Sequence, residues 1–205
     1  ADRSRCYARR AMSNAPLPPS TGQPTREDAW RLLCEWTTSP SLRKHGLAVE
    51  AAVAWYGANR FGLGGPELEL WRCAGLLHDF DYERYPAEHP LRGVEELRRL
   101  GYPELVVDAV LGHGDHTGHP RTTDLARTVY ACDEMAGFVV AVALVRPNKR
   151  LAEVDVEAVT KKMRDKGFAR QVSRDQLVAG AAELGLPLED HIANVIAGLR
   201  TVADA

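Results

Sequence analysis

The spacing of the apolar residues is the strongest constraint on how this chain can fold. From Thr25 to Val202 they recur at helical intervals in nine segments, and no stretch alternates apolar and polar residues in the strand manner for more than a few positions. Capping signals mark the boundaries: Thr25 precedes an acidic first turn, and Pro40 and Pro66 stand where helices begin. The pattern predicts an all-α protein. Its helices are expected over residues 25–36, 39–62, 65–79, 89–100, 103–113, 122–145, 154–166, 173–184 and 187–202.

The first 24 residues differ in composition from the rest of the chain. They are rich in proline and carry almost no large apolar side chains, so they cannot bury enough surface to offset their ordering entropy. We expect a flexible tail over residues 1–24 and a single helical domain over residues 25–205. Met12 is an alternative start of the natural protein, which the sequence alone does not decide.

The charge balance argues against a nucleic-acid polymer as partner. The net charge is −2, and no block of Lys and Arg is long enough to form a basic face, although a single nucleotide remains a possible ligand. The four cysteines are far apart and form no C-x-x-C pair. Their spacing therefore indicates neither a disulfide framework nor a thiolate zinc site. They favour a reducing compartment.

No segment reads as a membrane span or a signal peptide. The longest apolar stretch, residues 135–145, has 11 residues, well short of the ~20 that cross a bilayer. We therefore expect a cytoplasmic protein with no membrane partner, and a homodimer is one expected assembly.

Several acids and histidines fall where apolar residues are expected. His78 and Asp79 end the apolar run of residues 73–77, and Asp133 and Glu134 interrupt an otherwise apolar helix. A buried carboxylate without a partner costs several kcal/mol, and a divalent cation held by imidazoles would compensate it. Six of the seven histidines lie between Lys44 and Pro120, whereas His191 stands on a polar-looking stretch with no case as a ligand. Imidazole and carboxylate together suit Fe, Mn, Co, Ni or Zn.

These residues resemble a known family. His45, the pair His78-Asp79 and then Asp133 are similar to the H…HD…D signature of the HD superfamily of metal-dependent phosphohydrolases, over roughly residues 41–147. The resemblance implies a helical bundle with a metal site at its centre. Residues 78–83, 88–90 and 143–147 also resemble a subgroup known mainly as predicted HD hydrolases.

The resemblance implies a set of metal ligands and leaves the number of ions, one or two, open. His45, His78, Asp79 and Asp133 are the shared set, with Asp79 bridging two ions. His89 and His113 resemble the extra ligands of the two-metal branch. His116 competes with His113, because this chain has His113-Gly114-Asp115-His116 where some members have two adjacent histidines.

Catalytic roles are expected for Asp79, Glu83 and Arg84. Glu83 is similar in placement to a glutamate that assists the attacking water in one-metal members, and the alternative for both Glu83 and Asp81 is a solvated loop acid. Phosphate needs cationic partners, for which Arg84 and Arg146 are the candidates. Glu134 is expected to hydrogen-bond a ligand histidine.

The function implied is hydrolysis of a phosphomonoester, of a nucleotide or a small phosphorylated metabolite, by water that the metal activates. Two alternatives use the same fold. A mixed-valence di-iron oxygenase would cleave a C–C or C–P bond with the same ligands, and a non-catalytic module would bind a ligand without turnover.

Overall fold

The computed structural model describes residues 22–202, so residues 1–21 of the expected tail lie outside the described part. Over the described range the chain forms nine α-helices and no strand, which confirms the all-α prediction. The elements are α1 (Arg26–Trp36), α2 (Pro40–Asn59), α3 (Gly65–Leu77), α4 (Leu91–Arg99), α5 (Glu104–Gly112), η2 (Asp115–Thr117), α6 (Asp124–Leu144), η3 (Leu151–Glu153), α7 (Val156–Arg164), α8 (Arg174–Glu183) and α9 (Leu188–Arg200).

Local hydrogen bonds explain where the helices begin. Thr25 and Asp28 form a reciprocal capping box at α1, in which the Asp28 carboxylate accepts from the Thr25 amide at 2.9 Å and the Thr25 hydroxyl accepts from the Asp28 amide at 3.2 Å. The hydroxyl of Thr123 accepts from the amide of Ala126 at 3.1 Å and starts α6 in the same way. These short-range contacts are why the helix starts can be predicted from sequence.

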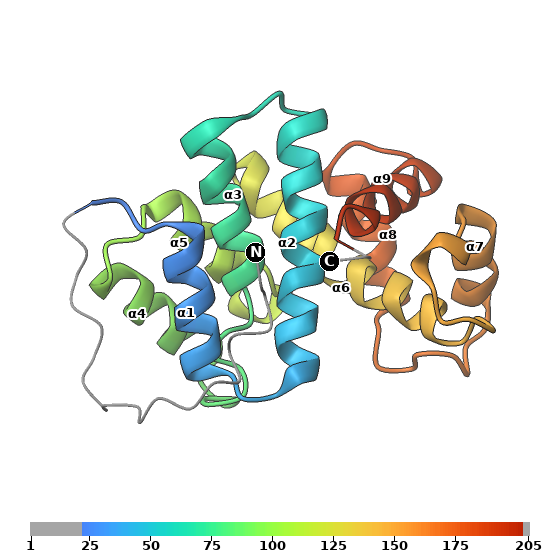
Figure 1. The fold of residues 1–205 in the computed structure, drawn as a ribbon, viewed down its shortest axis with the longest axis horizontal. Helices are drawn as coiled ribbons and strands as arrows, with labels where there is room; N and C mark the ends of the chain where they lie inside the picture. The colour runs from blue at the N-terminus through green and yellow to red at the C-terminus, as the bar shows by residue number, and fades with distance from the viewer. Residues whose placement is uncertain (1–21, 203–205) are drawn as a thin grey trace.

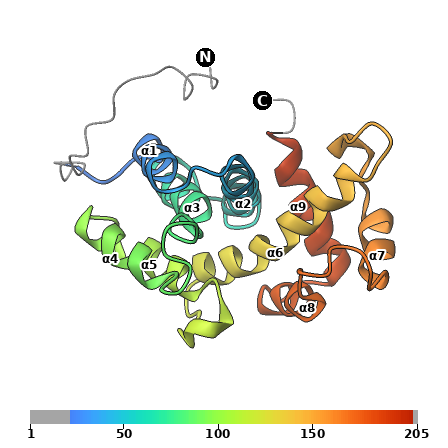
Figure 2. The same ribbon diagram turned by 90° about the horizontal axis from the view of Figure 1, so that it is seen from below.

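Helices α2 and α6 are the two central elements of the bundle. Helix α2 packs against α3, α6 and α9, and α6 packs against α5 and α8 as well. Figure 2 shows α6 running from the side of α4 and α5 to the side of α7 and α9. Figure 1 shows α2 and α3 side by side and roughly antiparallel. One hydrophobic cluster, from Ala29 in α1 to Leu199 in α9, joins both sides.

Two glycines let α2 and α3 approach closely. A Cβ atom at Gly75 would lie 2.9 Å from the Cα atom of Glu50, and one at Gly46 would lie 2.9 Å from the carbonyl oxygen of Leu76. Contacts this short would force the helices apart. The glycines therefore place His45 on α2 opposite His78 at the end of α3.

His191 is the one histidine whose surroundings the sequence analysis misread. It is fully buried in α9, although Glu189 and Asp190 beside it are exposed. Its Nε2–H donates to the carbonyl of Ala131 at 2.9 Å, and its Nδ1 accepts from the hydroxyl of Tyr56 at 2.7 Å. Burial lowers the pKa of His191 to about 4, so the neutral ring ties α9 to α6 and α2.

Two further expectations concern cysteines and membranes. Cys34, Cys73 and Cys132, the cysteines within residues 22–202, form no disulfide with one another. None of the helices in that range combines the length and apolar character that a bilayer crossing requires.

Candidate metal centre

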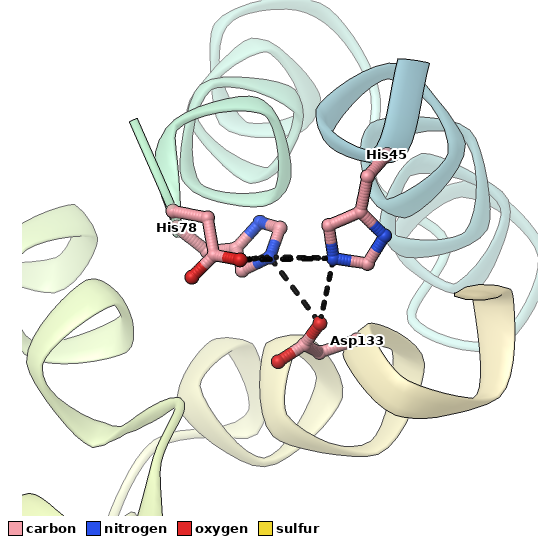
Figure 3. A group of neighbouring side chains, drawn as sticks. His45, His78 and Asp133 are labelled. Carbon is pink, nitrogen blue, oxygen red and sulfur yellow. Dashed lines mark hydrogen bonds and ion pairs between the residues drawn. The ribbon is translucent and has the colours of Figure 1, made fainter. Parts of the chain in front are cut away.

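Four side chains from three parts of the fold converge on one point. Figure 3 shows three of them, His45, His78 and Asp133, directed toward one another. His45 comes from α2, His78 and Asp79 follow the last turn of α3, and Asp133 comes from the middle of α6. One potential ligand atom of each lies within 4.8 Å of those of the others. The Nε2 atom of His45 is 2.9 Å from Oδ1 of Asp133 and 3.2 Å from Nε2 of His78. The sequence places these residues up to 88 positions apart, and the bundle brings them together.

A second group shares Asp79 with the first. Oδ1 of Asp79 lies 3.2 Å from Nε2 of His89 and 3.3 Å from Nε2 of His113. Its other oxygen, Oδ2, lies 3.4 Å from Nε2 of His78 and 3.8 Å from Nε2 of His45. The carboxylate of Asp79 therefore stands between the two groups and presents one oxygen to each.

Backbone carbonyls at two helix ends orient two of the imidazoles. The Nδ1–H of His78 donates to the carbonyl of Gly75 at 2.9 Å, and the Nδ1–H of His113 donates to the carbonyl of Val110 at 2.5 Å. The last carbonyls of a helix lack intrahelical partners and are available for such bonds. Whenever either ring is neutral, its proton is held on Nδ1, which leaves Nε2 unprotonated and facing the centre, as a metal ligand requires.

A buried carboxylate orients the third imidazole. His89 precedes α4, and its Nδ1–H donates to Oδ1 of Asp81 at 2.6 Å. Oδ2 of Asp81 accepts from the amide of Gly93 at 2.7 Å, and Asp81 is fully buried. A Cβ atom at Gly93 would lie 2.8 Å from the ring of Phe80 and 2.9 Å from Cγ of Asp81, so the site needs glycine there. Asp81 is thus a partner of His89 and not a solvated loop acid.

Burial and neighbouring charges have opposite effects on the pKa values of the ligand side chains. Complete burial disfavours the charged form of His78, but the carboxylates of Asp79 and Asp133 outweigh it and raise its pKa well above the usual range. Burial likewise opposes ionisation of Asp79, yet the charge of His78 and hydrogen bonds from the surrounding imidazoles lower its pKa. The pKa of Asp133 is lowered for the same reasons. Both carboxylates are therefore anionic at neutral pH.

The donor set suits a divalent transition metal. In each group the Nε2 atoms of two imidazoles lie 3.1–3.2 Å from each other. Two nitrogen lone pairs at this distance repel unless a proton or a cation lies between them. Nitrogen and carboxylate oxygen are the ligands that Fe, Mn, Co, Ni and Zn accept, and thiolate is absent from both groups in the described range. The residues present therefore fit one ion in each group, with Asp79 between them.

Two further histidines lie outside both groups. His116 is exposed in η2, and its Nε2 approaches only the carbonyl of His89, at 3.4 Å. His119 faces the carboxylate of Asp108 at 3.3 Å. The structure thus brings His113, and not His116, to the centre.

Glu83 and Arg84, for which catalytic roles were predicted, are engaged elsewhere. The exposed carboxylate of Glu83 accepts from the amides of Thr38 at 3.0 Å and Ser39 at 2.9 Å, at the start of α2. The guanidinium of Arg84 lies 4.8 Å from the centroid of the Trp36 ring. These contacts connect Glu83 to the start of α2 and Arg84 to the end of α1, and neither residue belongs to the two groups, so the catalytic role expected of them stays a prediction.

Two other predicted contributors also differ from expectation. Glu134 is half-buried and forms no hydrogen bond to a ligand histidine within the described range; burial, and then the charge of Asp133, raise its pKa to about 7. Arg146 stands 13 residues beyond Asp133, which corresponds to roughly 20 Å along a helix axis. Its Nε is buried without a hydrogen-bond partner, and within residues 22–202 no hydrogen bond or ion pair joins its guanidinium to the two groups, so the phosphate-binding role expected of Arg146 stays a prediction.

The comparison with protein families agrees with this geometry. The model of the HD domain matches residues 43–137, a range that begins two residues before His45 and ends four after Asp133. Residues 43–137 of this chain therefore form an HD domain. HD domains are typically metal-dependent phosphohydrolases, and the two groups described here are able to hold a metal. Searches of curated proteins and of solved structures returned no match to the chain.

Proposed function

We propose that this HD-domain protein is a metal-dependent phosphohydrolase that cleaves a phosphomonoester with activated water at a two-ion centre. The observation that carries the proposal is the position of Asp79, whose two oxygens face separate groups of imidazoles. A carboxylate placed in this way is suited to bridge two cations. The usual activity of HD domains supports the choice of reaction.

The residues of the chain have distinct roles in this proposal. His45, His78 and Asp133 would hold one ion, His89 and His113 would hold the other, and Asp79 would contribute to both. Divalent cations supply positive charge to the phosphate oxygens and lower the pKa of bound water. The carbonyls of Gly75 and Val110 keep two imidazoles in the tautomer that can bind the ions.

Two of the ligands are partly exposed to solvent. His78 is fully buried, but the side chains of His45 and Asp79 retain 24% and 25% of their exposure. We infer that a phosphate group reaches the centre past the exposed parts of these two side chains. A small phosphorylated molecule is therefore the substrate class that we propose.

The test combines metal analysis with phosphate release. The isolated protein should contain transition metal, and phosphate release with Mn²⁺ or Co²⁺ should be detectable for some member of a panel of nucleoside monophosphates and small phosphate esters. A chelator should abolish the activity and added metal should restore it. Asp79→Asn should lose metal and activity, whereas the exposed Asp108→Asn should retain both. Full activity of the metal-free protein, or of Asp79→Asn, would overturn the proposal.

A di-iron oxygenase is the second candidate, because the same six ligands and bridging carboxylate suit a pair of irons. It predicts consumption of O₂ by the iron-loaded protein and no phosphate release under anaerobic conditions. A protein that binds metal and ligand but shows neither reaction would instead be a non-catalytic binding module.

A further inference from the structure

A cavity of about 480 Å³ opens beside the second metal group. Its walls come from η2, from α6 and from the first turns of α8. The lining includes the polar side chains of Asp115, His116, Tyr130, Ser173, Asp175 and Gln176. The volume falls within the range of sites that bind small molecules.

Two sequence connections place the cavity next to the metal centre. Gly114, in the cavity wall, directly follows the ligand His113, and the ring of His116 lies 6.5 Å from that of His113. Tyr130, which also lines the cavity, stands three residues before Asp133 on α6, and residues at this spacing lie on the same face of a helix. The cavity and the centre therefore share the segment that follows His113 and one face of α6.

The lining of the cavity is acidic. Asp175 forms no hydrogen bond or ion pair within the described range. Asp115 pairs with Arg121 at 2.9 Å and accepts from the hydroxyl of Tyr130 at 3.1 Å, but Arg121 also pairs with Glu183 at 2.5 Å. One guanidinium thus pairs with two of the three carboxylates but offsets the charge of only one, so these four side chains carry a net negative charge.

The arginines nearest to the cavity are not available to bind an anion there. The guanidinium of Arg121 lies flat against Tyr130, 3.7 Å from the ring centroid, and is bound by carboxylates on its edges. Arg174 directs its guanidinium away, to the carbonyls of Ala169 and Val172, each at 2.8 Å. A second phosphate in the cavity would meet carboxylates without a free cation, whereas a positive charge would be attracted.

We propose that this cavity binds the end of the substrate remote from the reacting phosphate, and that this end carries a positive charge such as an ammonium group. Asp175 is the principal partner of that charge, and Asp115 contributes to the field. The inference rests on the proposed phosphatase function and narrows its substrate class. It favours aminoalkyl phosphates over nucleotides, which bring no such cation to Asp175.

The experiment compares two esters that differ in one charge. 2-Aminoethyl phosphate and propyl phosphate have similar size, and only the first carries an ammonium group. With the Mn²⁺-loaded protein, kcat/KM should be higher for the amino ester. Asp175→Asn should lower kcat/KM for the amino ester roughly threefold to tenfold, the effect of a partly screened ion pair, and leave propyl phosphate unchanged. Glu157→Gln is the matched control, because Glu157 is a first-turn acid of α7 outside the cavity.

A binding measurement separates this inference from the reaction. In the metal-free protein, 2-aminoethyl phosphate should shift the amide NMR signals of Gln176 and Ala179, and Asp175→Asn should weaken the shifts. Equal turnover of both esters, or no effect of Asp175→Asn on turnover of the amino ester, would overturn the inference and leave the proposed function standing. If no ester releases phosphate, the proposed function fails, and the NMR titration alone decides whether the cavity binds the cation.

Discussion

Replacing Asp81 with asparagine tests whether a carboxylate outside the ligand set controls the second metal group. The carboxylate of Asp81 accepts two hydrogen bonds, from the ring of His89 at 2.6 Å and from the amide of Gly93 at 2.7 Å. Asparagine has nearly the same shape but only one acceptor oxygen. If that oxygen stays on the Gly93 amide, the new NH₂ group faces His89 and the imidazole must accept at Nδ1.

The consequence for metal binding follows from the tautomer. When Nδ1 of His89 accepts, the proton of the neutral ring moves to Nε2, the atom that lies 3.2 Å from Asp79 and 3.1 Å from His113. A protonated nitrogen cannot bind a cation. Loss of such an outer partner typically weakens metal affinity 10- to 100-fold, or about 1.4–2.8 kcal/mol. The first group should be unaffected, because the carbonyl of Gly75 holds His78.

Calorimetric titration of the metal-free protein with Mn²⁺ or Co²⁺ measures this effect. The wild type should bind two ions, and Asp81→Asn should bind one with unchanged affinity and the other 10- to 100-fold more weakly. Asp108→Asn is the control, because Asp108 also pairs with a histidine, His119, but lies outside both groups. Two ions bound to Asp81→Asn with the wild-type affinities would refute the reasoning.

Two predictions concern stability. The pKa of His191 is about 4 in the folded protein and ~6.5 in the unfolded chain. On acidification the unfolded chain therefore takes up the proton first. The free energy of unfolding should fall by up to about 3 kcal/mol as the pH drops from ~6.5 towards 4. Urea unfolding at pH 7.5 and pH 5 should show a smaller difference for His191→Gln, and an equal difference in both proteins would contradict the assignment. Gly75→Ala should destabilise the protein by roughly 1–3 kcal/mol in thermal unfolding, because its Cβ would meet the backbone of Glu50. Gly137→Ala, whose added Cβ atom would lie 3.7 Å from the ring of His45, should cost less than about 1 kcal/mol, and equal losses in the two variants would argue against close packing of α2 and α3.

The helices could be predicted because their causes are local. The capping box of Thr25 and Asp28 and the proline at the start of α2 act within one helical turn, and the apolar period specifies which face is buried. The pattern of His45, His78-Asp79 and Asp133 was also visible, because polar residues inside apolar helices stand out. The structure then brought these four residues to one point.

Other features depended on contacts between residues far apart or in irregular segments. His113, and not His116, lies at the centre because the carbonyl of Val110 at the end of α5 orients the ring of His113. The ring of His116 is exposed in η2. Asp81 and Glu83 are two residues apart in one loop, yet one is buried against Gly93 and the other binds the start of α2. Helical periodicity predicts which side chains are buried only within helices. The direction of a side chain in a loop depends instead on how the helices around it pack.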